Sequence, residues 1–324
     1  MRKTKWKWEI RKYSRAFLLL ALLLFFSLAT DTFWSFDNWS NVANIVLYQA
    51  PVLILLSIGM TLVIVLKGID LSIGAVVAFS STIAAILMKN TQNVVLGILA
   101  GILVGALMGL LNGILIAVVK IPPYIATISV QWILKGVTNI ILQGSSLYQF
   151  PEGFKRLMQS TAWNYLLVSA AVALAMGILL TRTTYGRNIY AIGINGVAAK
   201  ISGVRTELVM VSVYMIVGVL GAITGIIYMS FLGGVDANIG ADFPIRAISA
   251  TLVGGTYFGG GKGSVSNAVT GSFVMLVLTN GLLHMGVPAV WQDVVIGLVI
   301  ILSVAAERNT FLKWKKLKAQ SGSI

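Results

Sequence analysis

The sequence predicts an all-α integral membrane protein with about ten transmembrane helices. Of its 324 residues, 57% are hydrophobic and only 10% are charged, and the mean hydropathy is +0.90. A soluble core cannot hide so much apolar surface. The apolar residues form continuous runs of roughly 20, the length that spans a bilayer as a helix, and they do not alternate as barrel strands do. We therefore expect a single transmembrane domain over residues 1–324.

Apolar windows between charged residues and Gly/Pro breaks predict ten spans. The eighth is the least regular, because four glycines interrupt it. Residues Trp39–Tyr48 form either the approach to the second span or an interfacial helix, so nine and eleven spans remain alternatives. The predicted spans are Ala16–Ala29, Leu47–Leu66, Ser72–Met88, Val94–Val119, Pro122–Leu142, Trp163–Thr181, Leu208–Leu232, Pro244–Gly260, Ser264–Met285 and Ala289–Ala306.

Lys and Arg residues indicate the orientation of these spans. With the amino terminus inside, nineteen of the 24 fall on the cytoplasmic side, most of them in the basic segment 1–15, in a long connection over 181–207 and in the tail 307–324. Basic residues concentrate on the cytoplasmic side of membrane proteins. We therefore expect both termini in the cytoplasm. The net charge of +14 reflects this topology and does not indicate binding to nucleic acid.

Two segments of the first half recur in the second half. Asp70–Ala75 resembles Asp236–Ala241 at an offset of 166 residues, and Leu111–Leu115 resembles Thr279–Leu283 at an offset of 168. This repeat maps helices 2–5 onto helices 7–10, and an odd shift places the two copies in opposite orientation. Inverted repeats of this kind are typical of transporters. We expect the two aspartates that begin the first pair of segments to cap helix starts.

Glycines recur at every fourth residue of the fourth span and leave one face of its backbone bare. In lipid, such a stripe of small residues lets two helices approach closely. We interpret it as a packing surface. Its members are Gly97, Gly101, Gly105, Gly109 and Gly113.

The sequence holds no recognisable catalytic or metal-binding constellation. It has no cysteine, ten carboxylates and one histidine, His284, so it offers neither a metal-ligand cluster nor a Ser/His/Asp arrangement. The run Gly254–Ser264 departs from a phosphate-binding loop, because Thr256 replaces its first glycine and Gly263 follows the lysine. We expect a tight turn there and no cofactor or metal on this chain. Energy for active transport would then come from an ion gradient or from a separate ATPase chain.

The long connection between the sixth and seventh spans is the most informative segment. Asn195 and Gly196 break it, Val197–Ser202 has the spacing of a short amphipathic helix, and Gly203 can end that helix. A small rigid helix held between two membrane helices can pass the motion of a soluble partner to the membrane core. We expect a docking role for this connection.

The same connection resembles the coupling segment of bacterial ribose-type permeases of ATP-driven importers. It contains the Gly-Arg, Ala-x-Gly-x-Asn and Ala-Ala elements of that pattern and its closing glycine. Three other stretches resemble the family in order and spacing, namely Gly68–Gly74, Lys120–Thr127 and Gly254–Ser264, so the match covers nearly the whole chain. The resemblance identifies the coupling residues as Gly186, Arg187, Ala191, Gly193, Asn195, Ala198, Ala199, Ser202 and Gly203.

The resemblance implies a cobalamin-importer-like fold in the bacterial inner membrane and a solute of the ribose, rhamnose, xylose or autoinducer-2 class. It also implies three partners: a second permease subunit in a homodimer or paired heterodimer, two cytoplasmic ATPase subunits that bind ATP and Mg, and an extracytoplasmic solute-binding protein. The chain departs from the family pattern before the eighth span, where Pro244 and Arg246 stand at positions that are often acidic.

Polar residues within the spans are candidates for the solute pathway. Lys135 is the clearest, because a charge near the centre of a membrane helix costs about 2.5–3.5 kcal/mol and normally requires a partner. Structural pairing is the alternative to solute contact for every member of this set, which comprises Asn112, Gln131, Lys135, Asn280 and Gln292.

These features favour the permease subunit of an ATP-driven importer, which moves a monosaccharide or sugar-like solute by alternating access and does not itself hydrolyse ATP. The alternative is a secondary transporter driven by an ion gradient. Its usual sign is buried acidic residues, and carboxylates are scarce in these spans. A third class, a membrane scaffold, would carry no solute with any partner.

Overall fold

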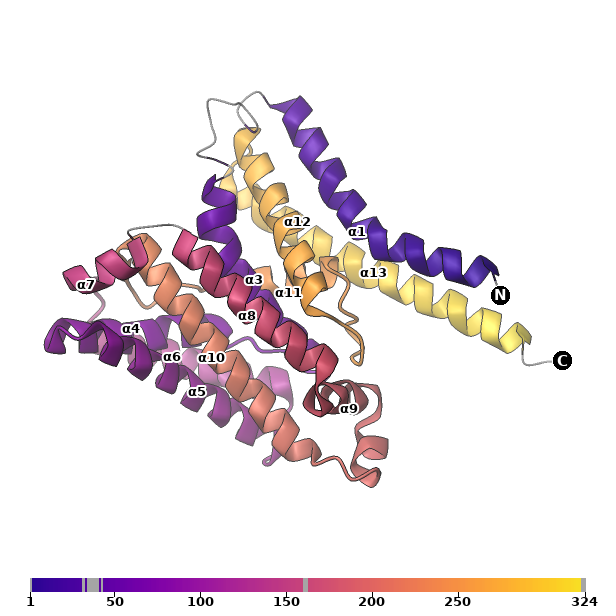
Figure 1. Cartoon of the computed structure of the whole chain (residues 1–324), viewed down its shortest axis with the longest axis horizontal. Coiled ribbons are helices and arrows are strands. Elements are labelled where there is room, and N and C mark those ends of the chain that lie inside the picture. The colour runs from indigo at the N-terminus through magenta and orange to yellow at the C-terminus, as the bar shows by residue number, and fades with distance from the viewer. Residues whose placement is uncertain (1, 31–32, 34–40, 42, 160–162, 322–324) are drawn as a thin grey trace.

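The computed structural model describes residues 2–30, 33, 41, 43–159 and 163–321, and helices dominate it (Figure 1). Each of the ten predicted spans corresponds to a helix. Within the described residues, seven helices are long and apolar enough to cross a membrane. Three shorter apolar helical stretches, Arg15–Ala29, Phe243–Val253 and Ala289–Ala305, account for the other predicted spans. The chain is therefore an all-α, multi-pass membrane protein.

The elements divide into two halves. The first half comprises α1 (Arg2–Ala29), the π-helical segment η2 (Asn44–Gln49), α3 (Ala50–Val65), α4 (Ile73–Thr91), α5 (Val94–Ala117) and α6 (Pro123–Leu142). Between the halves lie β1 (Leu147–Tyr148), α7 (Glu152–Phe154), η3 (Lys155–Gln159), α8 (Trp163–Arg182) and α9 (Thr184–Ile201). The second half comprises α10 (Thr206–Leu232), β2 (Gly234–Val235), α11 (Phe243–Val253), α12 (Val265–His284) and α13 (Ala289–Ser321). Strands β1 and β2 form a single short antiparallel pair.

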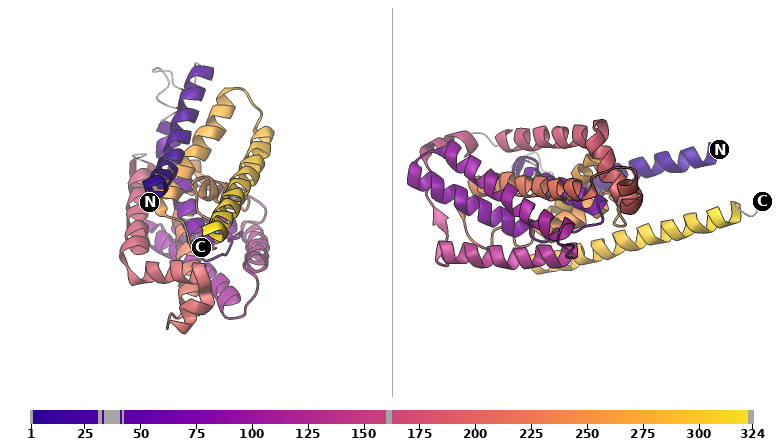
Figure 2. Two further views of the ribbon diagram at one scale, coloured as in Figure 1. Left: turned by 90° about the vertical axis from the view of Figure 1, so that its right-hand side faces the viewer. Right: turned by 90° about the horizontal axis from the view of Figure 1, so that it is seen from below.

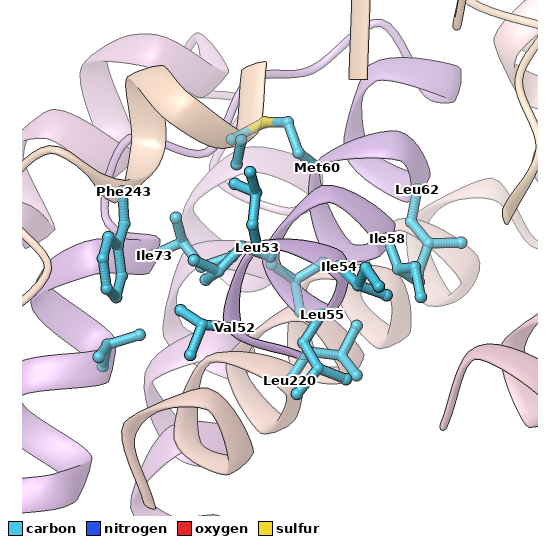
Figure 3. Packing of buried hydrophobic residues seen from close by; sticks show 14 of the residues in the cluster. Val52, Leu53, Ile54, Leu55, Ile58, Met60, Leu62, Ile73, Leu220 and Phe243 are labelled. Carbon is cyan, nitrogen blue, oxygen red and sulfur yellow. The ribbon is translucent and has the colours of Figure 1, made fainter. Parts of the chain in front are cut away.

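Helix α3 is the centre of the bundle. All sixteen of its residues are buried, and it packs against α8, α10, α11 and α12. Figure 3 shows its aliphatic side chains beside Ile73 of α4, Leu220 of α10 and Phe243 of α11. The outer helices α1, α5, α6, α8 and α13 expose many large apolar side chains, as contact with lipid or with another subunit requires.

Helix packing in one half corresponds to helix packing in the other. Helix α4 packs against α5, α6 and α10, and its matched helix α11 packs against α12, α13 and α3. Gly74 and Gly240, which match at the offset of 166, lie against each other: a Cβ atom at Gly74 would stand 2.1 Å from the Gly240 carbonyl oxygen. The matched segments therefore meet inside the molecule, as two copies related by an internal axis would.

The two matched aspartates make the same turn, but only one lies at a helix start. The carboxylate of Asp70 accepts a hydrogen bond from the N–H of Ser72 at 2.8 Å, immediately before α4. Asp236 accepts one from the N–H of Asn238 at 2.7 Å, yet α11 begins only at Phe243. The N-cap residue of α4 is Ser72, and no side chain caps it. The prediction of helix caps is therefore wrong for both aspartates, each of which closes a turn.

The glycine stripe of α5 is a packing surface, as predicted. A Cβ atom at Gly105 would stand 2.4 Å from the Gly218 carbonyl oxygen, and one at Gly109 would stand 2.2 Å from the Tyr214 carbonyl oxygen. Both carbonyls belong to α10, whereas Gly97 faces α4. Any side chain at these positions would force the helices apart.

The eighth span is shorter than predicted. Helix α11 ends at Val253, not at Gly260, because Gly255 and Gly260 adopt φ values of +85° and +81°. Glycine reaches this region without steric cost, whereas a helix cannot continue through it. Gly254–Ser264 is therefore the inter-helix turn that the sequence predicts.

The two terminal helices are longer than predicted. Helix α1 begins at Arg2 instead of Ala16, and α13 continues past Ala306 to Ser321. Figure 2 shows that both project from the same end of the bundle, near α9. The alternative of an interfacial helix over Trp39–Tyr48 falls partly outside the described residues; Asn44–Gln49 is π-helical and leads directly into α3.

Candidate functional site

Helix α9 consists of two parts joined at Asn195. This residue has non-helical backbone angles, φ −154° and ψ 98°. Its side-chain oxygen accepts hydrogen bonds from the N–H groups of Val197 and Ala198, each at 3.1 Å, and so caps the second part. Gly203, at φ +87°, follows its end. The predicted break and short helix are confirmed, whereas the first part, which begins at Thr184, was not predicted.

Gly193 anchors the first part of α9 to the membrane core. A Cβ atom there would stand 1.9 Å from the carbonyl oxygen of Val65, the last residue of α3, and 2.7 Å from the backbone nitrogen of Gly261. That nitrogen donates a hydrogen bond to the same Val65 carbonyl at 2.8 Å. Helix α9, the end of α3 and the α11–α12 turn therefore meet at one point.

Two tyrosines strengthen the attachment of α9. The Tyr190 hydroxyl donates to the Gly263 carbonyl oxygen at 2.8 Å, and the Tyr185 hydroxyl lies 2.6 Å from the Ser212 hydroxyl of α10. Burial raises the pKa of both tyrosines, so both stay protonated at neutral pH. A displacement of α9 would therefore act directly on α3, on α10 and on the turn before α12.

The opposite side of α9 is apolar and exposed. Ile194, Val197 and Ile201 have 68%, 71% and 83% of their surface exposed, and Ala198 lies beside them. Val197 and Ile201 are one helical turn apart and share a face. We call Ile194, Val197, Ala198 and Ile201 the exposed face of α9. The three large members were not predicted as functional residues, although apolar residues at this spacing in a charged connection could have indicated them.

The nine predicted coupling residues lie on both sides of α9. Three are buried and hold the helix in place, one is half-buried and five are exposed. Because Gly193 and Ala199 are among the buried ones, replacing them would disturb the fold as well as any docking. The buried residues are Gly186, Gly193 and Ala199, the half-buried one is Ala191, and the exposed ones are Arg187, Asn195, Ala198, Ser202 and Gly203.

Basic side chains from separate connections gather around α9. The Nζ atoms of Lys200 and Lys120 lie 2.7 Å and 3.7 Å from the carboxylate of Glu207. The Nζ atom of Lys67 donates to the Ile194 carbonyl oxygen at 3.2 Å. Solvent screens exposed ion pairs of this kind, so they add little stability. Their partners nevertheless bring basic residues of separate connections to one end of the bundle.

Two pathway candidates are hydrogen-bonded inside the bundle. The amide of Asn112 donates to the Ser72 hydroxyl at 2.7 Å, and Asn280 exchanges two amide hydrogen bonds with Asn41, at 2.9 Å and 3.0 Å. Both side chains are buried. For these two, the geometry shows structural pairing.

The other three candidates lie on peripheral helices. Gln131 and Lys135 are half-buried on α6, and Gln292 is half-buried on α13. The Nζ atom of Lys135 lies 5.6 Å from the ring centroid of Trp132, whose side chain is 65% exposed. The five candidates therefore do not form one cluster, and α6 presents polar groups on its outward side.

A cavity of about 320 Å³ lies beside the first half of α3. We call it the α3 cavity. Four aromatic rings lie in a row along it, each in contact with the next. The centroid separations are 5.0 Å for Tyr48–Phe231, 6.3 Å for Phe231–Tyr228 and 5.0 Å for Tyr228–Phe243. Its remaining lining comes from η2, α3, α11, α12 and α13: Asn44, Gln49, Val52, Leu53, Leu56, Asp242, Arg246, Met275, Leu276, Thr279 and Ile296.

Comparison with known proteins decides the family. Residues 42–304 match the family described as the permease component of branched-chain amino acid transport systems. The chain belongs to this permease family. It is 32% identical to a galactose/methyl galactoside import permease of Haemophilus influenzae, over 95% of this chain and 97% of the relative.

Other permeases are similar over most of their length. The ribose import permease of Bacillus subtilis is 35% identical over 85% of this chain and 87% of the relative. An autoinducer 2 import system permease of Photorhabdus luminescens is 31% identical over 87% of this chain and 86% of the relative. No solved structure matches this permease. The predicted resemblance to ribose-type permeases is confirmed.

Proposed function

We propose that this protein is the membrane-spanning subunit of an ATP-driven importer for a monosaccharide or sugar-like solute of the galactose, ribose or autoinducer-2 class. It works by alternating access in the bacterial inner membrane, with ten spans arranged as an inverted repeat in a cobalamin-importer-like fold. A solute-binding protein delivers the solute outside, and two cytoplasmic ATPase subunits supply the energy. The names of the relatives support the solute class, and the packing of the two halves supports the repeat.

The exposed face of α9 is the observation that carries the ATPase coupling. Large apolar side chains at the tip of a connection have no reason to face water unless a partner covers them. The other side of the same helix is fixed to Val65, Gly261 and Gly263. A groove on an ATPase subunit that takes up Val197 and Ile201 would therefore move the end of α3 whenever it moves.

The outward side of α6 supports a second permease subunit. In lipid, polar side chains within a span normally face protein or water. Gln131 and Lys135 do neither fully within this chain, because both are half-buried on a peripheral helix. A second copy against α6 would shield them.

The basic residues around α9 support a cytoplasmic position for this end of the bundle and for both termini. Lys67, Lys120 and Lys200 come from three different connections and all lie here. Cytoplasmic connections of membrane proteins carry this excess of basic residues.

Replacement of Ile201 by Asp tests the docking assignment. The charge would enter the proposed interface, and loss of one anchor of this kind costs roughly 2 kcal/mol or more, which weakens association about thirtyfold. Solute-stimulated ATP hydrolysis by the reconstituted complex should fall accordingly, while the amount of folded permease stays unchanged.

Thr184→Asp is the matched control, because Thr184 is exposed at the start of α9 and lies outside both the exposed face of α9 and the predicted coupling residues. It should retain most of the stimulated hydrolysis. Full stimulated activity of the Ile201 variant would refute the docking assignment.

A further inference from the structure

We infer that the α3 cavity is a binding site for one molecule of the transported sugar within a single subunit. This inference rests on the proposed function and specifies where the solute is held. Four aromatic side chains from three elements form one wall: Tyr48 of η2, Tyr228 and Phe231 of α10, and Phe243 of α11. Small-molecule sites combine such apolar walls with a few polar groups that fix orientation.

The polar groups of the cavity suit hydroxyl groups. Arg246 donates from Nε to the carboxylate of Asp242, one turn earlier. Asn44 and Gln49 make no side-chain hydrogen bond to the residues that the structure describes. An amide offers both donors and acceptors, and a paired carboxylate keeps lone pairs free. A ligand with several hydroxyl groups satisfies all of these atoms, whereas a hydrocarbon satisfies none.

The charge and size of the cavity favour a neutral small ligand. Its one acidic and one basic side chain neutralise each other, so no lining charge is left for an ionic ligand. Its volume of about 320 Å³ lies at the lower end of the range of about 300–1,000 Å³ for small-molecule sites. A monosaccharide meets both conditions better than a zwitterionic amino acid.

The position of the cavity connects it to α9 through a single helix. Val52, Leu53 and Leu56 of α3 line the cavity, and Val65 at the other end of α3 contacts Gly193 of α9. Helix α3 is buried along its whole length. A shift of α3 driven from α9 would therefore change the shape of the cavity directly.

Cysteine protection tests this assignment, because the chain has no cysteine of its own. Thr279→Cys places a reporter in the cavity wall, where the native hydroxyl donates a hydrogen bond to the Met275 carbonyl oxygen of its own helix. Lys135→Cys reports on α6, and Thr270→Cys, on the same helix as Thr279 but outside the cavity, is the control. The measured quantity is the rate of modification by methanethiosulfonate ethylammonium in the reconstituted transporter.

Galactose and ribose are the probes, and leucine is the zwitterionic comparison. At ten times the Kd, the sugar that the transporter takes up should slow modification at position 279 about tenfold, since the free fraction falls as 1/(1 + [L]/Kd). Positions 135 and 270 should be unaffected, and leucine should protect none. Protection at position 135 alone, or at none of the three, would overturn the inference.

A second variant gives a readout that does not depend on the reporter. Gln49→Leu keeps the bulk of the side chain and removes its hydrogen-bonding amide, so the KM for uptake should rise about tenfold, as for one lost hydrogen bond. The amount of assembled complex should not change, and an unchanged KM would count against the site. Uptake of neither sugar by the unaltered transporter would contradict the proposed function instead.

Discussion

At the scale of single residues, the polar side chains of the bundle serve mainly to hold it together. Asp70 is 2% exposed and accepts hydrogen bonds from both the N–H and the hydroxyl of Ser72. The Ser72 hydroxyl in turn accepts from Asn112. The sequence predicted a helix cap at Asp70, whereas this residue closes a turn onto Ser72, the N-cap residue of α4. It did not predict the partners of Asn112 and Asn280, because those partners come from distant segments that only the fold brings together.

The burial of Asp70 makes stability depend on pH. Burial raises the pKa of this carboxyl above its ordinary value of 3.8, despite the hydrogen bonds from Ser72. The folded state therefore holds the proton more tightly than the unfolded state. This contribution is fully present below pH 3.8 and is lost as the pH rises through the folded pKa.

Asp70→Asn removes this titration and keeps an acceptor oxygen toward Ser72. The apparent Tm of the variant in detergent, measured relative to that of the unaltered protein, should therefore increase as the pH rises from about 4 to about 8. Asp236→Asn, at the matched but half-buried position, controls for loss of an aspartate from this turn. A Tm difference for Asp70→Asn that does not vary with pH would contradict this account.

At the scale of elements, hydropathy predicts where the helices are but not where each one ends. Each of the ten predicted spans has a helix that includes most of its length, but α11 stops early, at glycines whose φ values hydropathy does not register. The first part of α9 was missed because it is too polar and too short to stand out as a span. The packing role of the glycine stripe of α5 could be predicted from the sequence, because a spacing of four residues defines one face of a helix.

Gly109→Ala should show how tightly α5 and α10 are packed. The added Cβ would lie 2.2 Å from the Tyr214 carbonyl oxygen and 2.8 Å from the Met215 Cα, and overpacking of this kind costs about 1–3 kcal/mol. The apparent Tm should fall by several degrees.

Gly177→Ala is the matched control for this helix contact, because a Cβ atom at Gly177 in α8 meets nothing within 4 Å. It should leave stability unchanged or raise it by up to about 1 kcal/mol, the difference in helix propensity. Equal effects of the two substitutions would show that close packing does not govern this contact.

At the scale of the whole molecule, the matched motifs predicted the repeat, and the packing of the two halves agrees with it. The α3 cavity could not be predicted, because its lining comes from six separate elements. The exposed face of α9 also needed the structure, since burial of Gly193 and Ala199 decides which side of the helix remains free.

Single cysteines test the proposed sidedness of the molecule. Ser202→Cys lies at the end of the bundle that carries α9. Thr91→Cys lies at the last residue of α4, at the opposite end of the bundle. Both native side chains are exposed. A membrane-impermeant maleimide applied to spheroplasts should label position 91, and should label position 202 only after the membrane is permeabilised. The reverse pattern would place the termini outside.

The central claim is that this protein moves solute only in partnership with ATPase subunits. The direct measurement is uptake of galactose and ribose into proteoliposomes, with and without the ATPase subunits and the solute-binding protein. We expect uptake that requires both partners and ATP, and no uptake by this chain alone under a proton or sodium gradient. Gradient-driven uptake by the chain alone would contradict the claim and would establish a secondary transporter.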